Sequence, residues 1–156
     1  MTERRDAQGY LQGSQREHDT ATPLFLTIDQ GGHASRVLVF DHAGHQVVEA
    51  RQTVEVSAPQ PDWVEQDAEA LVASVQSALV EAVQKLDARC QHIVAAGLVT
   101  QRSNIVCWDR CTGRALSPAI SWQDRRAHHW LQNFEAHAEK IRRITGLLPS
   151  AHYGAS

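Results

Sequence analysis

Two short apolar runs separated by a glycine turn constrain the fold most. Leu24 to Ile28 has the length of a strand, and Arg36 to Phe40 is rich in β-branched and aromatic residues. Between them lies the polar turn Asp29 to Gly32. After a second turn sequence, Asp41 to Gly44, a third strand is predicted from Gln46 to Val56. Three consecutive strands with short connections form an antiparallel meander.

A helix and a further strand are predicted after the meander. Asp67 can cap a helix whose apolar residues recur at three- and four-residue spacing, namely Leu71, Val75, Ala78, Leu79, Ala82, Val83 and Leu86. Ile93 to Val99 is almost continuously apolar, as in a central strand covered on both faces. A crossover through a helix makes this strand parallel to the first and places it alongside. Asp29 then faces Thr100 to Ser103, at the sheet edge where α/β proteins usually bind ligands.

The rest of the chain predicts smaller elements. Asn104 to Trp108 is predicted as a strand, and Ala115 to Ser121 as a short extended piece. One helix is predicted from near Gln123 through Phe134, and another over Ala138 to Thr145, ended by Gly146.

Composition indicates one ordinary soluble domain within 156 residues, 42% hydrophobic and 21% charged. The formal charge of -3 arises from 15 basic and 18 acidic residues that are mixed along the chain, which argues against a nucleic-acid partner. No apolar run approaches the roughly 20 residues that span a bilayer, and the start lacks a signal-peptide core, so we expect no membrane partner and a cytoplasmic location. Residues 1–22 are expected to be a disordered leader, and 23–156 the folded part.

The cysteines Cys90, Cys107 and Cys111 are interpreted as reduced, buried and inert thiols. Cys107 and Cys111 lie four residues apart, but no second pair at ligand spacing accompanies them. Zinc binding is therefore the weaker interpretation.

The first turn also has the composition of an anion-binding loop. Its adjacent glycines let successive N–H groups approach a phosphate, and Arg36 adds positive charge. Asp29 would repel a phosphate, so the pairing makes physical sense only with bound magnesium. Taken alone, the turn favours a plain hairpin whose glycines supply the backbone angles.

Further candidates lie beyond the central strand. Gln101 and Arg102 follow it directly, and Trp122 to Arg126 comes later in the chain. Polar groups at a strand end, a planar aromatic and a guanidinium are typical of sites for compact polyhydroxylated substrates. Each stretch alone also fits a capped loop or a solvated helix start.

Five ordered blocks together resemble the amino-terminal domain of the FGGY carbohydrate kinases, closest to the glycerol-kinase-like members. The blocks are Leu24 to Asp41, Gln60 to Asp67, Gly97 to Ser103, Trp108 to Gly113 and Trp122 to Arg126. The resemblance extends from about Leu24 to the last residue. It implies an incomplete α/β domain of the ribonuclease-H-like, actin and hexokinase type, and transfer of the γ-phosphate from Mg-ATP to a sugar or polyol hydroxyl.

The resemblance also implies roles for single residues. Contacts to phosphate and Mg-ATP fall on Asp29, Gln30, Gly31, Gly32, His33, Ser35 and Arg36, with Asp29 near the metal. Substrate contacts fall on Gln101, Arg102, Ser103, Trp122, Asp124, His152 and Tyr153. The family's general-base aspartate and its second domain correspond to positions after Ser156. The resemblance therefore implies a fragment that is inactive alone and has the remainder of the kinase chain as its partner.

Several positions depart from the family pattern. Gly32, His33 and Ala34 stand where residues with hydroxyl groups are usual, which removes donors to the phosphates. Ser103 replaces an acidic residue and His152 a tyrosine, which argues against glycerol itself as the acceptor.

Two alternatives stay open at this point. One is a non-catalytic remnant or interaction module with the same fold. The other is a ribonuclease-H-like nuclease, which needs several carboxylates around two metals, whereas only Asp29 is placed for that. The oligomeric state is undetermined, and a homo-oligomer is compatible with the sequence.

Overall fold

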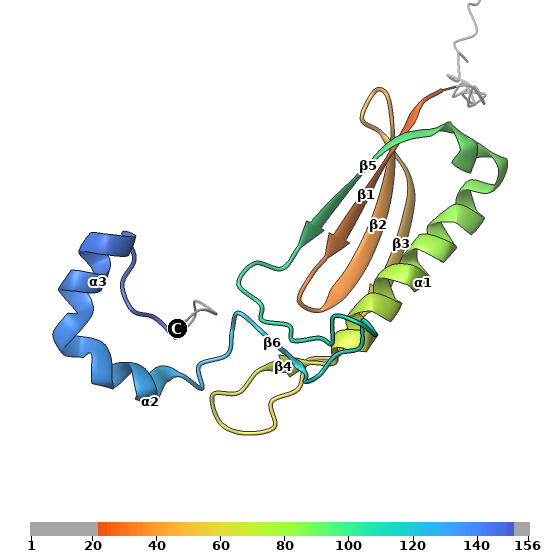
Figure 1. Cartoon of the computed structure of the whole chain (residues 1–156). Helices are drawn as coiled ribbons and strands as arrows, with labels where there is room; N and C mark the ends of the chain where they lie inside the picture. The colour runs from red at the N-terminus through yellow and green to blue at the C-terminus, as the bar shows by residue number, and fades with distance from the viewer. Residues whose placement is uncertain (1–21, 152–156) are drawn as a thin grey trace, which may run out of the picture.

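The computed structural model describes residues 22–151, and its main body is a four-stranded sheet with one long helix across it (Figure 1). The strands are β1 (Leu24–Gln30), β2 (Ala34–Asp41), β3 (Gln46–Thr53) and β5 (Ile93–Thr100). The helix is α1 (Ala68–Leu86), continued by the 3-10 helix η1 (Asp87–His92). Except for Thr22, the predicted leader lies outside the described residues.

The sheet has the order β3-β2-β1-β5. β1 pairs with β2, and β2 with β3, in antiparallel fashion, whereas β1 pairs with β5 in parallel. Asp29 is opposite Val99 in the parallel pair, so the ends of β1 and β5 lie together. The meander, the crossover helix and the parallel strand are thus confirmed.

The strand ends differ slightly from the prediction. β1 continues through Gln30, because the N–H of Gly31 donates to the Ala34 carbonyl at 2.9 Å and closes the turn further along the chain. β3 ends at Thr53 instead of Val56, and the next N–H, of Val54, donates to the His33 carbonyl at 2.9 Å.

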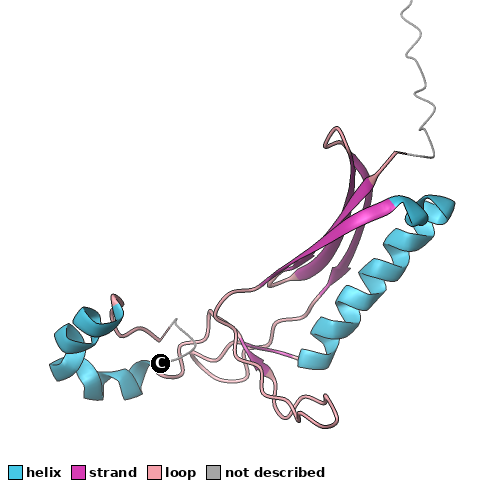
Figure 2. Ribbon diagram, turned by 45° about the horizontal axis from the view of Figure 1, so that its top comes forward, coloured by secondary structure: helices cyan, strands magenta, loops and turns pink. Residues whose placement is uncertain are grey.

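The core lies between the sheet and α1 (Figure 2). Asp67 caps the helix as predicted, since its Oδ1 accepts from the N–H groups of Glu69 at 2.8 Å and Ala70 at 3.1 Å. Small residues at four-residue spacing let the helix pack closely on β2 and β3. The buried helix positions are Ala68, Ser74, Ala78, Ala82 and Leu86. The predicted stripe is therefore partly right, with Ser74 in the buried row and Val83 exposed.

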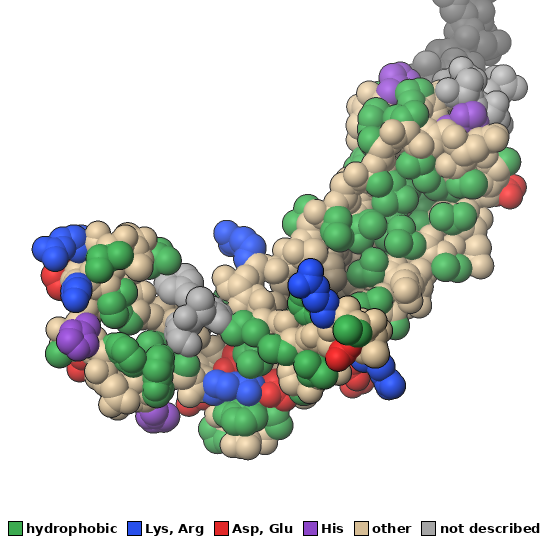
Figure 3. Space-filling model, in the orientation of Figure 1, with side chains coloured by type: hydrophobic (Ala, Val, Ile, Leu, Met, Phe, Trp, Pro, Cys, Tyr) green, Lys and Arg blue, Asp and Glu red, His purple; other side chains and the backbone are tan. Residues whose placement is uncertain are grey.

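β5 is not covered on both faces as predicted. Val94, Leu98 and Val99 are 64%, 61% and 66% exposed, because α1 covers the β2 and β3 side of the sheet. Figure 3 shows hydrophobic side chains gathered over the sheet. In residues 22–151 no strand pairs with the outer edge of β5. An apolar sequence run thus forms an open edge.

The second half of the chain is less regular. A two-residue strand, β4 (Glu65–Gln66), pairs antiparallel with β6 (Ala119–Ile120), and β4 was not predicted. The predicted strand Asn104 to Trp108 is wrong, because β6 offers it only a single bridge, between Ile105 and Ile120, and Trp108 bridges Ala115.

Three short helices form an arm away from the sheet (Figure 1). They are α2 (His128–Leu131), η2 (Gln132–His137) and α3 (Ala138–Thr145). The predicted end at Gly146 is confirmed, with φ of 76°. The predicted start near Gln123 is wrong, because the Asp124 side chain accepts from the Arg126 N–H at 2.9 Å and favours a turn over a helix. Within residues 22–151, no helix is both long enough and apolar enough to cross a bilayer.

Candidate phosphate and substrate site

Gly31 to His33 form the tight loop between β1 and β2. Besides the closure from Gly31 to Ala34, the loop is attached to the end of β3 by the bond from Val54 to His33. A Cβ atom at Gly31 would lie 3.0 Å from the Ala34 carbonyl oxygen, a backbone atom, so a side chain at this position would force the loop backbone to shift by a few tenths of an ångström. A Cβ at Gly32 would meet only Gln101 Oε1, at 3.5 Å. The two glycines are therefore not equivalent.

Asp29 and Arg36 are opposite each other beside this loop. Arg36 Nη2 donates to Asp29 Oδ2 at 2.7 Å, and both side chains are partly exposed. No group of three His, Cys, Asp or Glu side chains that could hold a metal ion occurs in residues 22–151. A single carboxylate fits magnesium held mainly by phosphates and water, which is the usual arrangement for that ion.

The other phosphate candidates point in different directions. Ser35 is fully buried, and its hydroxyl lies 2.8 Å from that of Ser74 on α1. Its side chain therefore faces the core and not the loop. His33 is exposed beside Gly32. The loop consequently offers its backbone and one imidazole to an anion, and no hydroxyl at positions 31–34.

Three glutamine amides join the loop to the end of β5. Gln66 Nε2 donates to the Gly32 carbonyl at 2.9 Å, and Gln101 Nε2 donates to Gln66 Oε1 at 3.0 Å. Gln101 Nε2 also makes a longer contact of 3.4 Å to Gln30 Oε1, and Gln30 Nε2 donates to the Gly31 carbonyl at 3.0 Å. The structure thus brings the predicted residues Gln30 and Gln101 together. It adds Gln66, for which the only sequence signal was its place in one of the five blocks.

Gln101 Oε1 is a buried acceptor for which no hydrogen-bond partner is found among the described residues. It lies near the position that a Gly32 side chain would take, so Gly32→Ser would place a hydroxyl donor beside it. We expect this substitution to raise the free energy of unfolding by about 1 kcal/mol relative to Gly32→Ala. Urea unfolding of both variants checks this, and equal stabilities would show that the serine hydroxyl does not reach the oxygen.

The predicted substrate residues after β5 lie at a sharp turn. Arg102 is exposed, and Ser103 has φ of 59°, a left-handed conformation that few residues other than glycine adopt. The N–H of Trp122 donates to Asn104 Oδ1 at 2.9 Å, which holds the half-exposed indole near the exit of β5. The predicted contacts His152 and Tyr153 lie outside the described residues.

Asp124 is placed differently from the other substrate candidates. It is 4% exposed and accepts from the Val64 N–H at 2.7 Å and from Arg126 Nε and Nη2 at 2.9 and 2.8 Å. Arg126 also pairs with Glu65 at 2.7 Å and lies 3.8 Å from the centre of the Trp63 ring. Burial would raise the pKa of Asp124, but the hydrogen bonds from Arg126 and Val64 outweigh it and lower the pKa. The carboxylate anchors β4 to the turn before α2.

Two other aspartates are turn caps. The N–H of His45 contributes most to lowering the pKa of Asp41, and the N–H and hydroxyl of Thr112 do the same for Asp109.

Cys107 and Cys111, which flank the Asp109 turn in sequence, are exposed. The prediction that they are buried is therefore wrong.

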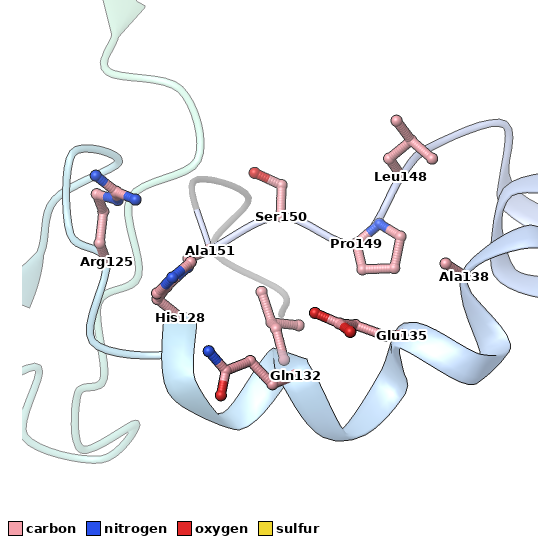
Figure 4. Close-up of a pocket in the computed structure, with 10 residues that line it drawn as sticks. Arg125, His128, Gln132, Glu135, Ala138, Leu148, Pro149, Ser150 and Ala151 are labelled. Atoms are coloured by element: carbon pink, nitrogen blue, oxygen red, sulfur yellow. The ribbon is translucent and has the colours of Figure 1, made fainter.

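A separate cavity of about 370 Å³ lies in the arm (Figure 4). His128 and Glu135 project from α2 and η2 toward the segment 148–151, and Arg125 stands at one end. Of the candidate stretches named from the sequence, only Trp122 to Arg126 contributes to its lining within residues 22–151, through Arg125.

The family comparison matches the order of these elements. The family described as "FGGY family of carbohydrate kinases, N-terminal domain" matches residues 24–156. This chain belongs to the FGGY family. Its sheet, crossover helix and glycine loop are accordingly those of an FGGY amino-terminal domain, with the ribonuclease-H-like fold.

Curated relatives and solved structures agree with this assignment. Glycerol kinases of Stenotrophomonas maltophilia strain K279a and Koribacter versatilis are each 38% identical over 86% of this chain, which spans 28% and 27% of those proteins. A crystal structure of Plasmodium falciparum glycerol kinase with ADP matches with a TM-score of 0.75 and 25% identity, over 86% of this chain and 27% of that one. A xyloylose kinase from Brucella ovis matches with a TM-score of 0.75 and 26% identity, over 83% and 26%. The chain thus spans little more than a quarter of these FGGY relatives.

Proposed function

We propose that this chain is the amino-terminal part of an ATP-dependent kinase that transfers the γ-phosphate to a hydroxyl of a sugar or polyol. The observation that carries the proposal is the contact between the Gly31–His33 loop and Gln101 through Gln66. This contact joins a backbone suited to phosphates and the strand end that carries Arg102. Family membership supports the same reaction.

Each side of this junction has its own task in the proposed reaction. The Gly31 N–H already closes the turn, so the loop backbone after it would offer N–H groups to phosphate oxygens. Asp29 would help to hold a magnesium ion, which would supply neutralisation of phosphate charge when bound. Arg102 donates to acceptor hydroxyls, and Trp122 covers the carbon chain. Asp41, Asp109 and Asp124 serve as caps and anchors, and we assign the removal of the hydroxyl proton to a residue outside this chain, as the family resemblance implies.

The acceptor is proposed to be a sugar or a polyol other than glycerol. Curated relatives are named glycerol kinases, whereas solved structures with the same fold include xylulose and gluconate kinases. Ser103 supplies no carboxylate beside Arg102, so acceptor recognition at this point depends on neutral donors and the guanidinium.

A kinase assay with a panel of polyols, ketoses and sugar acids tests the proposal. We expect the complete gene product to phosphorylate at least one acceptor with Mg-ATP, and residues 1–156 alone to show no turnover, because half of the cleft cannot align donor and acceptor. Turnover by residues 1–156 alone would contradict the proposal that catalysis needs a further part of the kinase. A complete gene product inactive on the whole panel would favour a non-catalytic interaction module.

A further inference from the structure

We propose that Gln66 is a positioning residue that holds the phosphate loop in a fixed relation to the acceptor end of β5. This inference rests on the proposed kinase function. Gln66 is 2% exposed, and its amide uses both ends, donating to Gly32 and accepting from Gln101. A buried side chain in β4 therefore connects the two halves of the junction directly.

The direction of every bond in this chain of amides is fixed by backbone groups. The carbonyls of Gly31 and Gly32 accept only, so the amide nitrogens of Gln30 and Gln66 must point at them. The oxygens of these two side chains then both face Gln101, whose nitrogen has two hydrogens to donate. Turning over the Gln30 or Gln66 amide would lose a bond to a carbonyl, and turning over Gln101 would set its oxygen against two acceptors, so the network has a single orientation.

Gln66 is itself held rigidly on both sides. Its strand pairs with β6, where Gln66 is opposite Ala119, and the next residue, Asp67, caps α1. The loop is already closed by Gly31 and anchored by Val54, and a glutamine held by a strand and a helix cap adds the restraint that fixes it relative to Gln101. A residue of this kind matters most where donor and acceptor must be aligned, because small misplacements reduce phosphoryl transfer more than binding.

The variant Gln66→Met tests the role, since it keeps the length of the side chain and removes both hydrogen bonds. The control Gln76→Met makes the same change at an exposed position of α1. The amides of Gly31 and Val54 are the reporters, because their bonds close and anchor the loop. In the complete gene product we expect their hydrogen-exchange protection to fall about tenfold in Gln66→Met and to stay unchanged in Gln76→Met. We also expect kcat to fall about tenfold or more, with the acceptor KM within about threefold.

A second variant, Gln66→Glu, serves if Gln66→Met does not fold. It keeps the oxygen that accepts from Gln101 and removes the N–H that donates to Gly32, so it tests the bond to the loop alone. A protonated carboxyl can donate again, and burial raises the pKa of such a group, so protection lost at neutral pH should be partly regained in mild acid. Unchanged protection in the folded variants would overturn the inference. An inactive wild-type protein would overturn the proposed function, while the exchange data would still decide whether Gln66 holds the loop.

Discussion

Replacing Gly31 by alanine is expected to abolish most phosphoryl transfer by the complete gene product, with a loss of at least about 100-fold in kcat. The new Cβ would lie 3.0 Å from the Ala34 carbonyl oxygen, which belongs to the backbone and moves only if the loop moves. The bond from Gly31 to Ala34 that closes the turn would be disturbed by the same shift. Steady-state kinetics with a fixed acceptor measures the effect.

Gly32→Ala is the matched control for this prediction. It adds the same methyl group one residue further on, where the nearest atom is 3.5 Å away and belongs to a side chain. We expect kcat within about threefold of the wild type, and urea unfolding should separate the two variants by about 1–3 kcal/mol, with Gly31→Ala the less stable. Equal losses in both variants would show that flexibility, and not the close approach at Gly31, is what the loop requires.

Asp124→Ala is expected to lower the free energy of unfolding by about 3 kcal/mol. The substitution leaves the half-buried Arg126 guanidinium with Glu65 as its remaining carboxylate partner, and it leaves the Val64 N–H without its acceptor. Urea unfolding followed by tryptophan fluorescence suits the measurement, because the Trp63 ring packs against Arg126. Asp124→Asn keeps an acceptor for Val64 and should fall between the alanine variant and the wild type.

Glu139→Ala is the control for an exposed ion pair. Glu139 lies 3.4 Å from Arg142 and is 82% exposed, so its loss should change stability by less than about 0.5 kcal/mol. A comparable loss at both positions would mean that charge alone, and not the buried hydrogen bonds of Asp124, determines the effect.

The Asp124 contribution also depends on pH. Its pKa in the folded protein lies below the ordinary value of 3.8, so the stabilisation is complete above that pH and is lost as the pH falls through the folded-state pKa. The stability difference between the wild type and Asp124→Asn should therefore shrink below about pH 4. A difference that stays constant down to pH 2 would contradict the assigned role.

Sequence alone predicted the sheet, because its signals are local. The apolar runs at Leu24 and Ile93, the turn glycines and the Asp67 cap each act within a few residues, and the crossover rule supplies the parallel pairing. The same local signals were wrong for the strand Asn104 to Trp108 and for the helix start near Gln123, where a long-range bond between Trp122 and Asn104 and a buried carboxylate determine the path of the chain. The secondary-structure propensity of a residue carries no information about contacts with residues 18 or 60 positions away in the sequence.

The site was predicted unevenly for related reasons. Glycines and strand ends identify a loop and an edge, so the sequence predicted that the turn at Gly31 and the strand end at Gln101 lie close together, which the hydrogen bonds through Gln66 bear out as a placement. The direction in which a side chain points depends on packing, so Ser35 facing Ser74 and the burial of Asp124 could not be read from the sequence. Gln66 resembles any polar residue before a helix cap until its partners are known.

The contacts of the phosphate loop and the anchor of the helical arm should also differ in their sensitivity to acid. Gln30, Gln66 and Gln101 have no ionisable group, whereas the anchor of the arm depends on Asp124, Glu65 and Arg126. Protonation can therefore release the arm while the hydrogen-bond pattern of the loop stays intact. Acid is therefore expected to weaken the anchor of the arm before it changes the amide contacts of the Gly31–His33 loop.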